Sequence, residues 1–337
     1  MTVETLETHT PELFQSAVRR AADLLRAGGV VALPTETVYG LAANALDPRA
    51  VAALFEIKGR PAHNPIIVHV ASVEMARRCV AEWPESAGKL AAAFWPGPLT
   101  LVLPRSKEIP DAVTAGGPTV GVRWPSHPLI QAVIRECGFP LAAPSANPSR
   151  RISPTNAGHV RRQLGGKLRL IVDGGPSQVG IESTVLDLTV RPPRVLRPGM
   201  IQEQALWAAL GEVRGAKSEV RGSEPLRSPG QLHHHYAPKA KLVVWSWRDA
   251  ADLKSRISHL ASRISNWHVI AHTRIPSAEG FGGVSVIPRD PEAFARALYA
   301  ELHRCDEAGA EWIVVEAPPA TPEWSAIADR LKRAAAA

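Results

Sequence analysis

The spacing of apolar residues along the chain predicts helices and strands in irregular alternation. Residues 11–27 carry apolar side chains at helical spacing as far as a Gly-Gly pair, and the apolar run VVALP follows directly as a strand. Asp47 and Pro48 are typical N-cap and first-turn residues of a helix that is expected to end at Lys58. Several later strands follow one another closely, which favours a mixed α/β sheet over a regular doubly wound one.

The remaining periodicity falls into two stretches of the chain. In the first stretch, strands are expected at 66–70, 100–104, 119–124, 141–144 and 168–173, and helices at 73–80, 85–94, 127–137 and 155–164. In the second stretch, strands are expected at 241–246, 267–272, 283–288 and 312–317, and helices at 249–264, 291–308 and 324–334. The second stretch has the pattern of a smaller Rossmann-like α/β unit.

Residues 211–240 interrupt this pattern and are rich in Gly, Ser, Pro and charged residues, which is typical of a linker. Long connections of this kind are often functional, so this linker could serve as a lid. A length of 337 residues favours two domains. We therefore expect a first domain at 1–210, a linker at 211–240 and a second domain at 241–337. The second domain lacks a G-x-G-x-x-G turn and is expected to bind no nucleotide of its own.

Composition excludes several classes of protein. With 45% apolar and 21% charged residues, wholesale disorder is excluded. No stretch approaches the roughly 20 apolar residues of a membrane helix, and the polar, acidic N-terminus is unlike a signal peptide. We therefore expect a cytoplasmic protein with no membrane partner. Cys79, Cys137 and Cys305 lie far apart without CxxC spacing, so buried thiols are expected rather than a disulfide framework or a zinc site.

The net charge of +7 is concentrated in the first part of the chain. Residues 1–200 hold 22 basic and 16 acidic side chains, whereas residues 241–337 hold 12 of each. No carboxylate occurs between Glu136 and Asp173, where six basic residues lie. Such a stretch indicates an anionic partner, either a phosphate-bearing small molecule or nucleic acid. A solvated helix face explains Arg161 and Arg162 better than it explains the loop pair Arg150 and Arg151. The six residues are Arg150, Arg151, Arg161, Arg162, Lys167 and Arg169.

Four polar clusters follow expected strands or helices, where side chains commonly enter a site. Each cluster has a structural alternative. Threonines, serines and asparagines also form caps and turns, and Lys58 and Arg60 could interact favourably with the dipole at the C-terminus of a helix. Together, without a Walker A loop, a metal triad or a Ser-His-Asp motif, they favour binding of phosphate and carboxylate groups with little covalent catalysis. The clusters are residues 34–40, residues 58–61 with Asn64 and His69, residues 144–149 with 153–155, and residues 180–184 with 197–199.

These clusters, in this order, resemble the YrdC/Sua5 family. The resemblance is carried by LPTETVYGLAANA, KGRPAHNPIIVHV, FWPGPLTLVL, VGVRWPSHP, APSANPS, SPT, IESTVLDL and VLRPG. The linker SPGQLHHHYAPK and the terminal unit ending in ADRLKRAA resemble the long Sua5 form, so the match covers nearly the whole chain. The resemblance implies a YrdC-like catalytic domain, a linker and a Rossmann-like domain. It also implies synthesis of L-threonylcarbamoyl-AMP and pyrophosphate from L-threonine, bicarbonate and ATP, for modification of tRNA.

The resemblance also implies roles for individual residues. The Lys58/Arg60 and Ser145/Asn147 pairs would be catalytic, and Tyr236 of the linker would close over the nucleotide. Mg²⁺ would be bound through ATP phosphates and not by protein side chains, no organic prosthetic group is expected, and a separate transferase would accept the product. Threonine would be held by Thr37, His69, Arg123, the backbone at Ala143, and Ser183. ATP would be held by Lys58, Arg60, Asn64, Thr119, Ser145, Ser153, Arg197 and Tyr236.

Elementary chemistry agrees with part of this assignment. Arg123 lies among apolar neighbours on an expected strand, and a buried guanidinium can hold a carboxylate through two parallel hydrogen bonds. His69 lies inside IIVHV, where a lone histidine is normally a core residue, so its ligand role depends on the family match. A zinc site at His233-His234-His235 is not expected, because consecutive side chains point in different directions.

Two alternatives stay open at this point. The basic segment at 150–169 could belong to a tRNA- or double-stranded-RNA-binding module without synthase activity, and weak tRNA binding is also compatible with the enzyme. A carbamoyl-transferring relative involved in hydrogenase maturation shares the first domain, but it is expected to carry CxxC zinc fingers, which the three scattered cysteines exclude.

Overall fold

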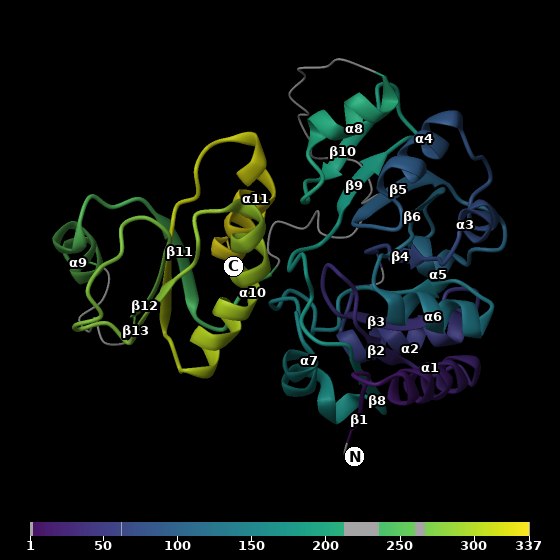
Figure 1. Cartoon of the computed structure of the whole chain (residues 1–337), viewed down its shortest axis with the longest axis horizontal. Coiled ribbons are helices and arrows are strands. Elements are labelled where there is room, and N and C mark those ends of the chain that lie inside the picture. Colours follow the sequence, from purple (N-terminus) through teal and green to yellow (C-terminus); the bar gives the residue numbers. More distant parts are fainter. Residues whose placement is uncertain (1–2, 62, 212–235, 260–266, 337) are drawn as a thin grey trace. The chain divides into compact units, whose positions relative to one another are not determined.

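The computed structural model describes residues 3–61, 63–211, 236–259 and 267–336, which form two compact units (Figure 1). The first unit comprises Met1–Ser149 and Ser153–Gln231, and the second comprises Arg150–Ile152 and Leu232–Ala337. Most of the expected linker, residues 212–235, lies outside the described residues. The assignment of residues 150–152 to the second unit has no signal in the sequence. No helix in the described ranges is long and apolar enough to cross a bilayer.

The first unit is built on a ten-stranded mixed sheet with the order β1-β8-β2-β3-β7-β4-β6-β5-β9-β10. Strand β4 runs parallel to β6, whereas β7 joins β3 and β4 through antiparallel pairing. The expected mixed α/β fold is therefore confirmed. The strands are β1 (Glu4–Glu7), β2 (Val31–Leu33), β3 (Gly40–Asn44), β4 (Ile67–His69), β5 (Leu99–Pro104), β6 (Thr119–Arg123), β7 (Leu141–Ala142), β8 (Leu170–Asp173), β9 (Thr184–Asp187) and β10 (Arg194–Arg197).

Helices cover both faces of this sheet because its central strands are apolar on both sides. In β2, Val31 and Leu33 pack with α1 and α6, whereas Ala32 packs in a second cluster with α2, α4, α7 and α8. Asp47 caps α2 through its side chain, as its position in the sequence predicts. The helices are α1 (Pro11–Arg26), α2 (Pro48–Lys58), α3 (Val73–Cys79), α4 (Glu85–Phe94), α5 (Asp111–Thr114), α6 (Pro128–Cys137), α7 (Ala157–Leu164) and α8 (Glu203–Leu210), with a 3₁₀ turn η1 (Gly165–Lys167).

Four short strands, β1, β3, β9 and β10, have no counterpart in the sequence expectations. Strand β3 has the sequence GLAAN, whose small residues have low strand propensity, and it forms because β2 and β7 flank it on both sides. Strand β1 has the sequence ETLE and pairs only with β8 at the edge of the sheet. Tertiary pairing, which local patterns do not show, therefore determines these strands.

The second unit contains a smaller, entirely parallel sheet with the order β11-β14-β12-β13. Its strands and helices follow the expected pattern, although the end of the expected helix 249–264 lies outside the described residues. The rings of Trp267 and Trp312 stack at 4.7 Å on neighbouring strands. The elements are β11 (Lys241–Trp245), α9 (Ala250–Ser258), β12 (Trp267–Ala271), β13 (Gly283–Val286), α10 (Pro291–Glu307), β14 (Trp312–Glu316), a 3₁₀ turn η3 (Pro322–Trp324) and α11 (Ser325–Ala335).

Glu316 is the last residue of β14, and its carboxylate lies at the carboxyl ends of the strands, where α/β folds often bind anions. Its carboxylate accepts hydrogen bonds from the backbone amides of His272 and Thr273 at 2.8 Å each, and from that of Arg274. Burial alone would raise the pKa of Glu316, but these amides and the charge of His272 leave the pKa below its ordinary value. An internal carboxylate thus uses the amides that a bound anion would need.

Glu316→Gln should lower the free energy of unfolding of the second unit by about 2–3 kcal/mol, because an amide NH₂ would face backbone donors. The pKa is lowered in the folded state, so this stabilisation is present at neutral pH and should disappear as the pH falls below about 4. Urea denaturation followed by tryptophan fluorescence measures the effect. Glu279→Gln, the same change at an exposed position, is the matched control. Equal stability of the two variants would contradict this role of Glu316.

Candidate functional site

The connection between β2 and β3 is a buried polar loop. Thr35, Glu36 and Thr37 are at most 5% exposed. The Thr35 hydroxyl donates to Val38 O at 2.6 Å and accepts from the amides of Thr37 and Val38 at 3.2 and 3.3 Å. Ser177 Oγ donates to Thr35 O at 3.0 Å. These bonds fix the backbone, so the side chains of Glu36 and Thr37 project from a rigid support.

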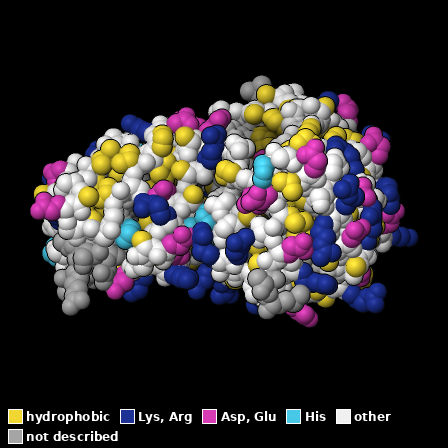
Figure 2. Space-filling model, turned by 60° about the horizontal axis from the view of Figure 1, so that its bottom comes forward, with side chains coloured by type: hydrophobic (Ala, Val, Ile, Leu, Met, Phe, Trp, Pro, Cys, Tyr) yellow, Lys and Arg dark blue, Asp and Glu magenta, His cyan; other side chains and the backbone are white. Residues whose placement is uncertain are grey.

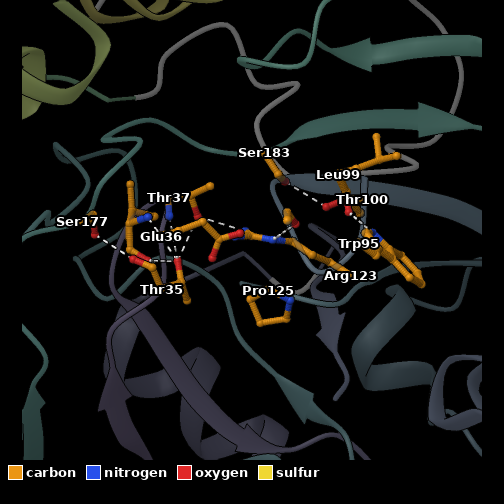
Figure 3. Close-up of polar contacts among 12 residues, drawn as sticks. Thr35, Glu36, Thr37, Trp95, Leu99, Thr100, Arg123, Pro125, Ser177 and Ser183 are labelled. Carbon is orange, nitrogen blue, oxygen red and sulfur yellow. Dashed lines mark hydrogen bonds and ion pairs between the residues drawn. The ribbon is translucent and has the colours of Figure 1, made fainter. Parts of the chain in front are cut away.

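Arg123, at the end of β6, extends toward this loop (Figure 3). Its Nη1 donates to Thr37 Oγ1 at 2.9 Å, and its Nη2 lies 2.7 Å from Glu36 Oε1 in an ion pair. Its Nε donates to Gly97 O at 3.4 Å. The side chains of Arg123 and Glu36 are 5% and 7% exposed, so the pair is almost completely removed from water. A buried charge pair is a weak source of stability, which favours a functional explanation for this one.

Three of the expected ligand-binding residues, and the neighbouring Glu36, keep buried polar atoms without a hydrogen-bond partner among the described residues. Such atoms are rare in folded proteins, because each costs about 1–3 kcal/mol. Their presence in residues of this loop and its neighbours indicates a site for a polar ligand. The atoms are the amide nitrogen and oxygen of Asn64, Nδ1 of His69, Nη2 of Arg123 and both carboxylate oxygens of Glu36.

His69 lies beside Arg123, because β4 and β6 are parallel and pair these two residues in register. Burial and the charge of Arg123 lower the pKa of His69 to about 3, and a hydrogen bond with Ile67 opposes this shift only in part. His69 is therefore neutral at physiological pH. It can exchange hydrogen bonds with a ligand, whereas the charge that binds a carboxylate must come from Arg123.

His69→Gln should weaken the dependence of stability on pH. Below about pH 6.5 the unfolded chain protonates His69 and the folded chain does not, so stability falls with pH from about 6.5 toward 3. When the pH is lowered from 7 to 5, protonation of His69 in the unfolded chain should reduce the free energy of unfolding by about 2 kcal/mol. The variant should not show this part of the decrease. Urea denaturation at both pH values measures it. His9→Gln, at an exposed position, should keep the wild-type slope; a parallel slope for His69→Gln would contradict the shift.

Lys58, at the end of α2, binds the loop that contains Ser145 and Asn147. Its Nζ donates to Ser145 O at 2.6 Å, to Asn147 O at 2.7 Å and to Asn147 Oδ1 at 3.0 Å. Burial and the nearby charge of Arg60 lower the pKa of Lys58, and Glu182 opposes this. The three oxygens can only accept hydrogen bonds, so they engage three N–H groups and retain the ammonium form. Lys58 therefore ties α2 to this loop.

Arg60 stabilises the segment that follows α2. Its Nε donates to Asn64 O at 3.0 Å, and its Nη2 donates to Pro65 O at 2.7 Å. Gly59 ends α2 with φ 61°, the left-handed conformation that glycine adopts without strain. The glycine therefore turns the chain between the two cations, and each side chain reaches a different set of carbonyl groups.

Ser183 links Arg197 to β5. Ser183 Oγ lies 2.8 Å from Thr100 Oγ1 and accepts from Arg197 Nη2 at 3.1 Å, and Arg197 Nε donates to Ser183 O at 3.1 Å. Gly199 permits this close packing, since a Cβ at that position would lie 2.3 Å from Thr184 N. The R-P-G motif thus holds a further buried guanidinium next to the serine.

Main-chain hydrogen bonds join two of these segments. Ala146 N donates to Tyr39 O at 2.8 Å, and Leu41 N donates to Pro144 O at 2.7 Å. The Lys58-bound loop therefore lies directly along the 34–40 segment, whose Thr37 binds Arg123. The structure brings the first three polar clusters of the sequence together in this way.

Three other expected residues of the first unit are Ser153, Ala143 and Thr119. Ser153 Oγ donates to Glu182 Oε1 at 2.6 Å. Ala143 is buried, and its amide donates to Ile67 O at 3.1 Å. Thr119 begins β6 and is partly exposed.

Tyr236, which is expected to close over the nucleotide, packs within the second unit. It is 1% exposed, and its ring lies 5.9 Å from the ring of Tyr299. The guanidinium of Arg330 lies 5.2 Å from the centre of the Tyr236 ring. Contact between Tyr236 and a nucleotide stays a prediction, and the neighbouring His233–His235 lie outside the described residues.

Glu36, Glu182 and Thr100 contact expected site residues. Glu36 and Glu182 lie in the polar clusters of the sequence but had no expected role of their own, and Thr100 lies outside those clusters. Both glutamates are buried and lie next to a threonine or serine that the family resemblance selects. An acidic residue between hydroxyl residues, directly after a buried strand, is the signal that could have identified Glu36. Thr100 gives no such signal, because a threonine within the apolar run LTLVLP is typical of an ordinary strand.

Comparison with known proteins agrees with this geometry. Residues 23–199 match the Sua5/YciO/YrdC family model, described as telomere recombination, and residues 199–336 match the C-terminal domain of threonylcarbamoyl-AMP synthase. The chain belongs to the Sua5/YciO/YrdC family. This finding confirms the resemblance that the sequence motifs indicated.

Relatives of the Sua5 type match along nearly the full chain. Threonylcarbamoyl-AMP synthase of Pyrococcus abyssi is 40% identical, covering 94% of this chain and 93% of the relative. The enzyme of that name from Bacillus subtilis is also 40% identical, with coverage of 98% and 94%. The crystal structure of P. abyssi Sua5 complexed with L-threonine has a TM-score of 0.88 and 38% identity, covering 99% of this chain and 98% of that one.

Proposed function

We propose that this Sua5-family chain is a threonylcarbamoyl-AMP synthase. The observation that carries the proposal is the buried guanidinium of Arg123, set beside Thr37 and a neutral His69. This arrangement offers a cation for the carboxylate of an amino acid and hydroxyl and imidazole groups for its polar side chain. The full-length relatives with synthase names favour this function over an RNA-binding module without activity.

The proposed reaction has two bond-forming steps. The amino nitrogen of L-threonine bonds to the carbon of bicarbonate, which releases water and a proton and gives a carbamate. A carbamate oxygen then attacks the α-phosphorus of ATP, and the bond to pyrophosphate breaks. Neither step needs a covalent enzyme intermediate, so positioning and charge neutralisation supply the catalysis.

The ATP side of the site is proposed from the cations of the first unit. Arg60 and Arg197 supply guanidinium groups, and Lys58 fixes the loop that carries Ser145 and Asn147. This donor set suits phosphate oxygens, and its cations do not suit direct ligation of a metal ion. We therefore propose that Mg²⁺ enters as part of the ATP substrate, bound through its phosphates. Asn64, Thr119, Ser153 and Tyr236 complete the proposed ATP contacts.

Weak tRNA contact is a separate part of the proposal, as is delivery of the product to a transferase. Arg161, Arg162, Lys167 and Arg169 are exposed around α7 and β8. Figure 2 shows that Lys and Arg side chains on that face of the molecule are interspersed with Asp and Glu. Such mixed charge favours weak, salt-dependent binding over a high-affinity RNA surface. We also place the reaction in the cytoplasm, where ATP and tRNA are available and where three free, buried cysteines are chemically suited.

The proposed function is tested by measuring pyrophosphate release with each substrate omitted in turn. Release is expected only when L-threonine, bicarbonate and ATP are all present. Release that continues without threonine would contradict the proposal, because ATP hydrolysis alone would explain it.

A further inference from the structure

The carboxylate of Glu36 lies in the amino-acid site but has no part in the function proposed above. Its backbone is fixed, since Glu36 O accepts from Val179 N at 2.7 Å. Its Oε1 lies 2.7 Å from Arg123 Nη2, yet the pair lacks the angles of a hydrogen bond. Within the described ranges, neither carboxylate oxygen accepts a hydrogen bond.

This environment is unusual for a buried carboxylate in the same chain. Glu316 accepts from three backbone amides, and Glu182 accepts from Ser153 Oγ. Glu36 is just as buried but has one poorly aligned cation in place of such donors. Removing a carboxylate from water without hydrogen bonds costs several kcal/mol. The Glu36 carboxylate can therefore accept hydrogen bonds from a ligand that carries a donor group.

The charges around Glu36 indicate what that donor is. An α-amino acid carries its carboxylate and its ammonium group on the same carbon. A site that binds both groups therefore needs a cation and an anion side by side. Arg123 and Glu36 form such a pair. When a ligand carboxylate engages Arg123, Glu36 needs a new cation, and the nearby histidines do not supply one, since burial lowers the pKa of both His69 and His127.

We propose that Glu36 is the counter-ion for the α-ammonium group of the substrate. In the substrate-free enzyme it neutralises Arg123, and on binding the substrate exchanges this internal pair for two intermolecular ones. The inference rests on the proposed amino-acid substrate. It makes Glu36 a specificity determinant, because a plain hydroxy acid would take Arg123 from Glu36 and leave the buried carboxylate without a cation.

The test compares L-threonine with (R)-3-hydroxybutyrate, which is threonine without its α-amino group, by titration calorimetry. The wild-type enzyme should bind the hydroxy acid at least about 30-fold more weakly than threonine. Glu36→Gln keeps the shape of the side chain and removes its charge, so it should weaken threonine binding by a similar factor. The same variant should bind the hydroxy acid as well as or better than wild type, because Arg123 is no longer neutralised.

The control is Glu56→Gln, the same change at an exposed position of α2, which should leave both affinities unchanged. Equal weakening of both ligands in Glu36→Gln would show a merely structural role and overturn the inference. Unchanged threonine binding in that variant would overturn it as well. The wild-type comparison needs no variant and decides the matter even if Glu36→Gln does not fold: equal affinity for the two ligands would refute the inference.

The outcomes also separate this inference from the proposed function. If wild type binds threonine and discriminates against the hydroxy acid but releases no pyrophosphate with all three substrates, the synthase function fails and the role of Glu36 stands. If pyrophosphate release depends on threonine but both affinities respond equally to Glu36→Gln, the function stands and the role of Glu36 fails.

Discussion

Arg123→Met should lower kcat/KM for threonine by at least about 100-fold, because a buried guanidinium that binds a carboxylate contributes roughly 3 kcal/mol or more. ATP affinity should change little, since Arg123 contacts Thr37, Glu36 and Gly97, none of which is proposed to hold ATP. Threonine-dependent pyrophosphate release and ATP binding measure the two effects. Arg78→Met, which removes an exposed surface ion pair, is the control and should leave both unchanged.

Stability must be separated from activity in this experiment. Arg123→Met leaves the buried carboxylate of Glu36 without its cation, which should cost about 3–5 kcal/mol of folding free energy. The double variant Arg123→Met/Glu36→Gln removes both charges and should recover most of this stability without recovering activity. Recovery of activity in the double variant, or wild-type use of threonine by Arg123→Met, would contradict the assignment of Arg123 to the substrate carboxylate.

Lys58→Met should have the second large effect, on the ATP side of the site. Its ammonium group is the common partner of Ser145 and Asn147, so its loss removes a charged donor from their buried carbonyl and amide oxygens. We expect a loss of about 3 kcal/mol in stability and at least a tenfold rise in KM for ATP. Urea denaturation and initial rates at varied ATP measure these changes.

Two further variants sharpen the interpretation of Lys58. Lys58→Arg should not restore ATP affinity, because a planar guanidinium cannot direct three bonds into a pocket shaped for an ammonium group. Lys89→Met, at an exposed position of α4, should behave as wild type. An unchanged KM for ATP in Lys58→Met would show that this loop does not contribute to nucleotide binding.

The fold could be predicted well where the signal is local. Asp47 and Gly59 mark the ends of α2 through capping chemistry, and the structure places both as expected. Strand β3 could not be predicted, since GLAAN becomes a strand only between β2 and β7. The pairing of β4 with β6, which sets His69 beside Arg123, likewise depends on contacts distant in the sequence.

Individual site residues show the same difference between what the sequence indicates and what only the structure shows. Thr37 and Arg123 were expected to bind the same ligand, and the structure joins them directly, although the ligand itself is a proposal. Glu36 lies in the first polar cluster of the sequence, but no role was expected for it, since only the fold shows that it is buried against Arg123. Sequence patterns thus indicate which segments meet, whereas charge pairing within the site requires the structure.

The most direct test of the central claim is a mass-spectrometric analysis of the nucleotide product formed with ¹³C-bicarbonate. Our proposal predicts that, with ATP and L-threonine present, one labelled carbon appears in threonylcarbamoyl-AMP, and that no such product forms when threonine is omitted. Formation of unlabelled threonyl-AMP, or of AMP alone with unchanged yield in the absence of threonine, would contradict it.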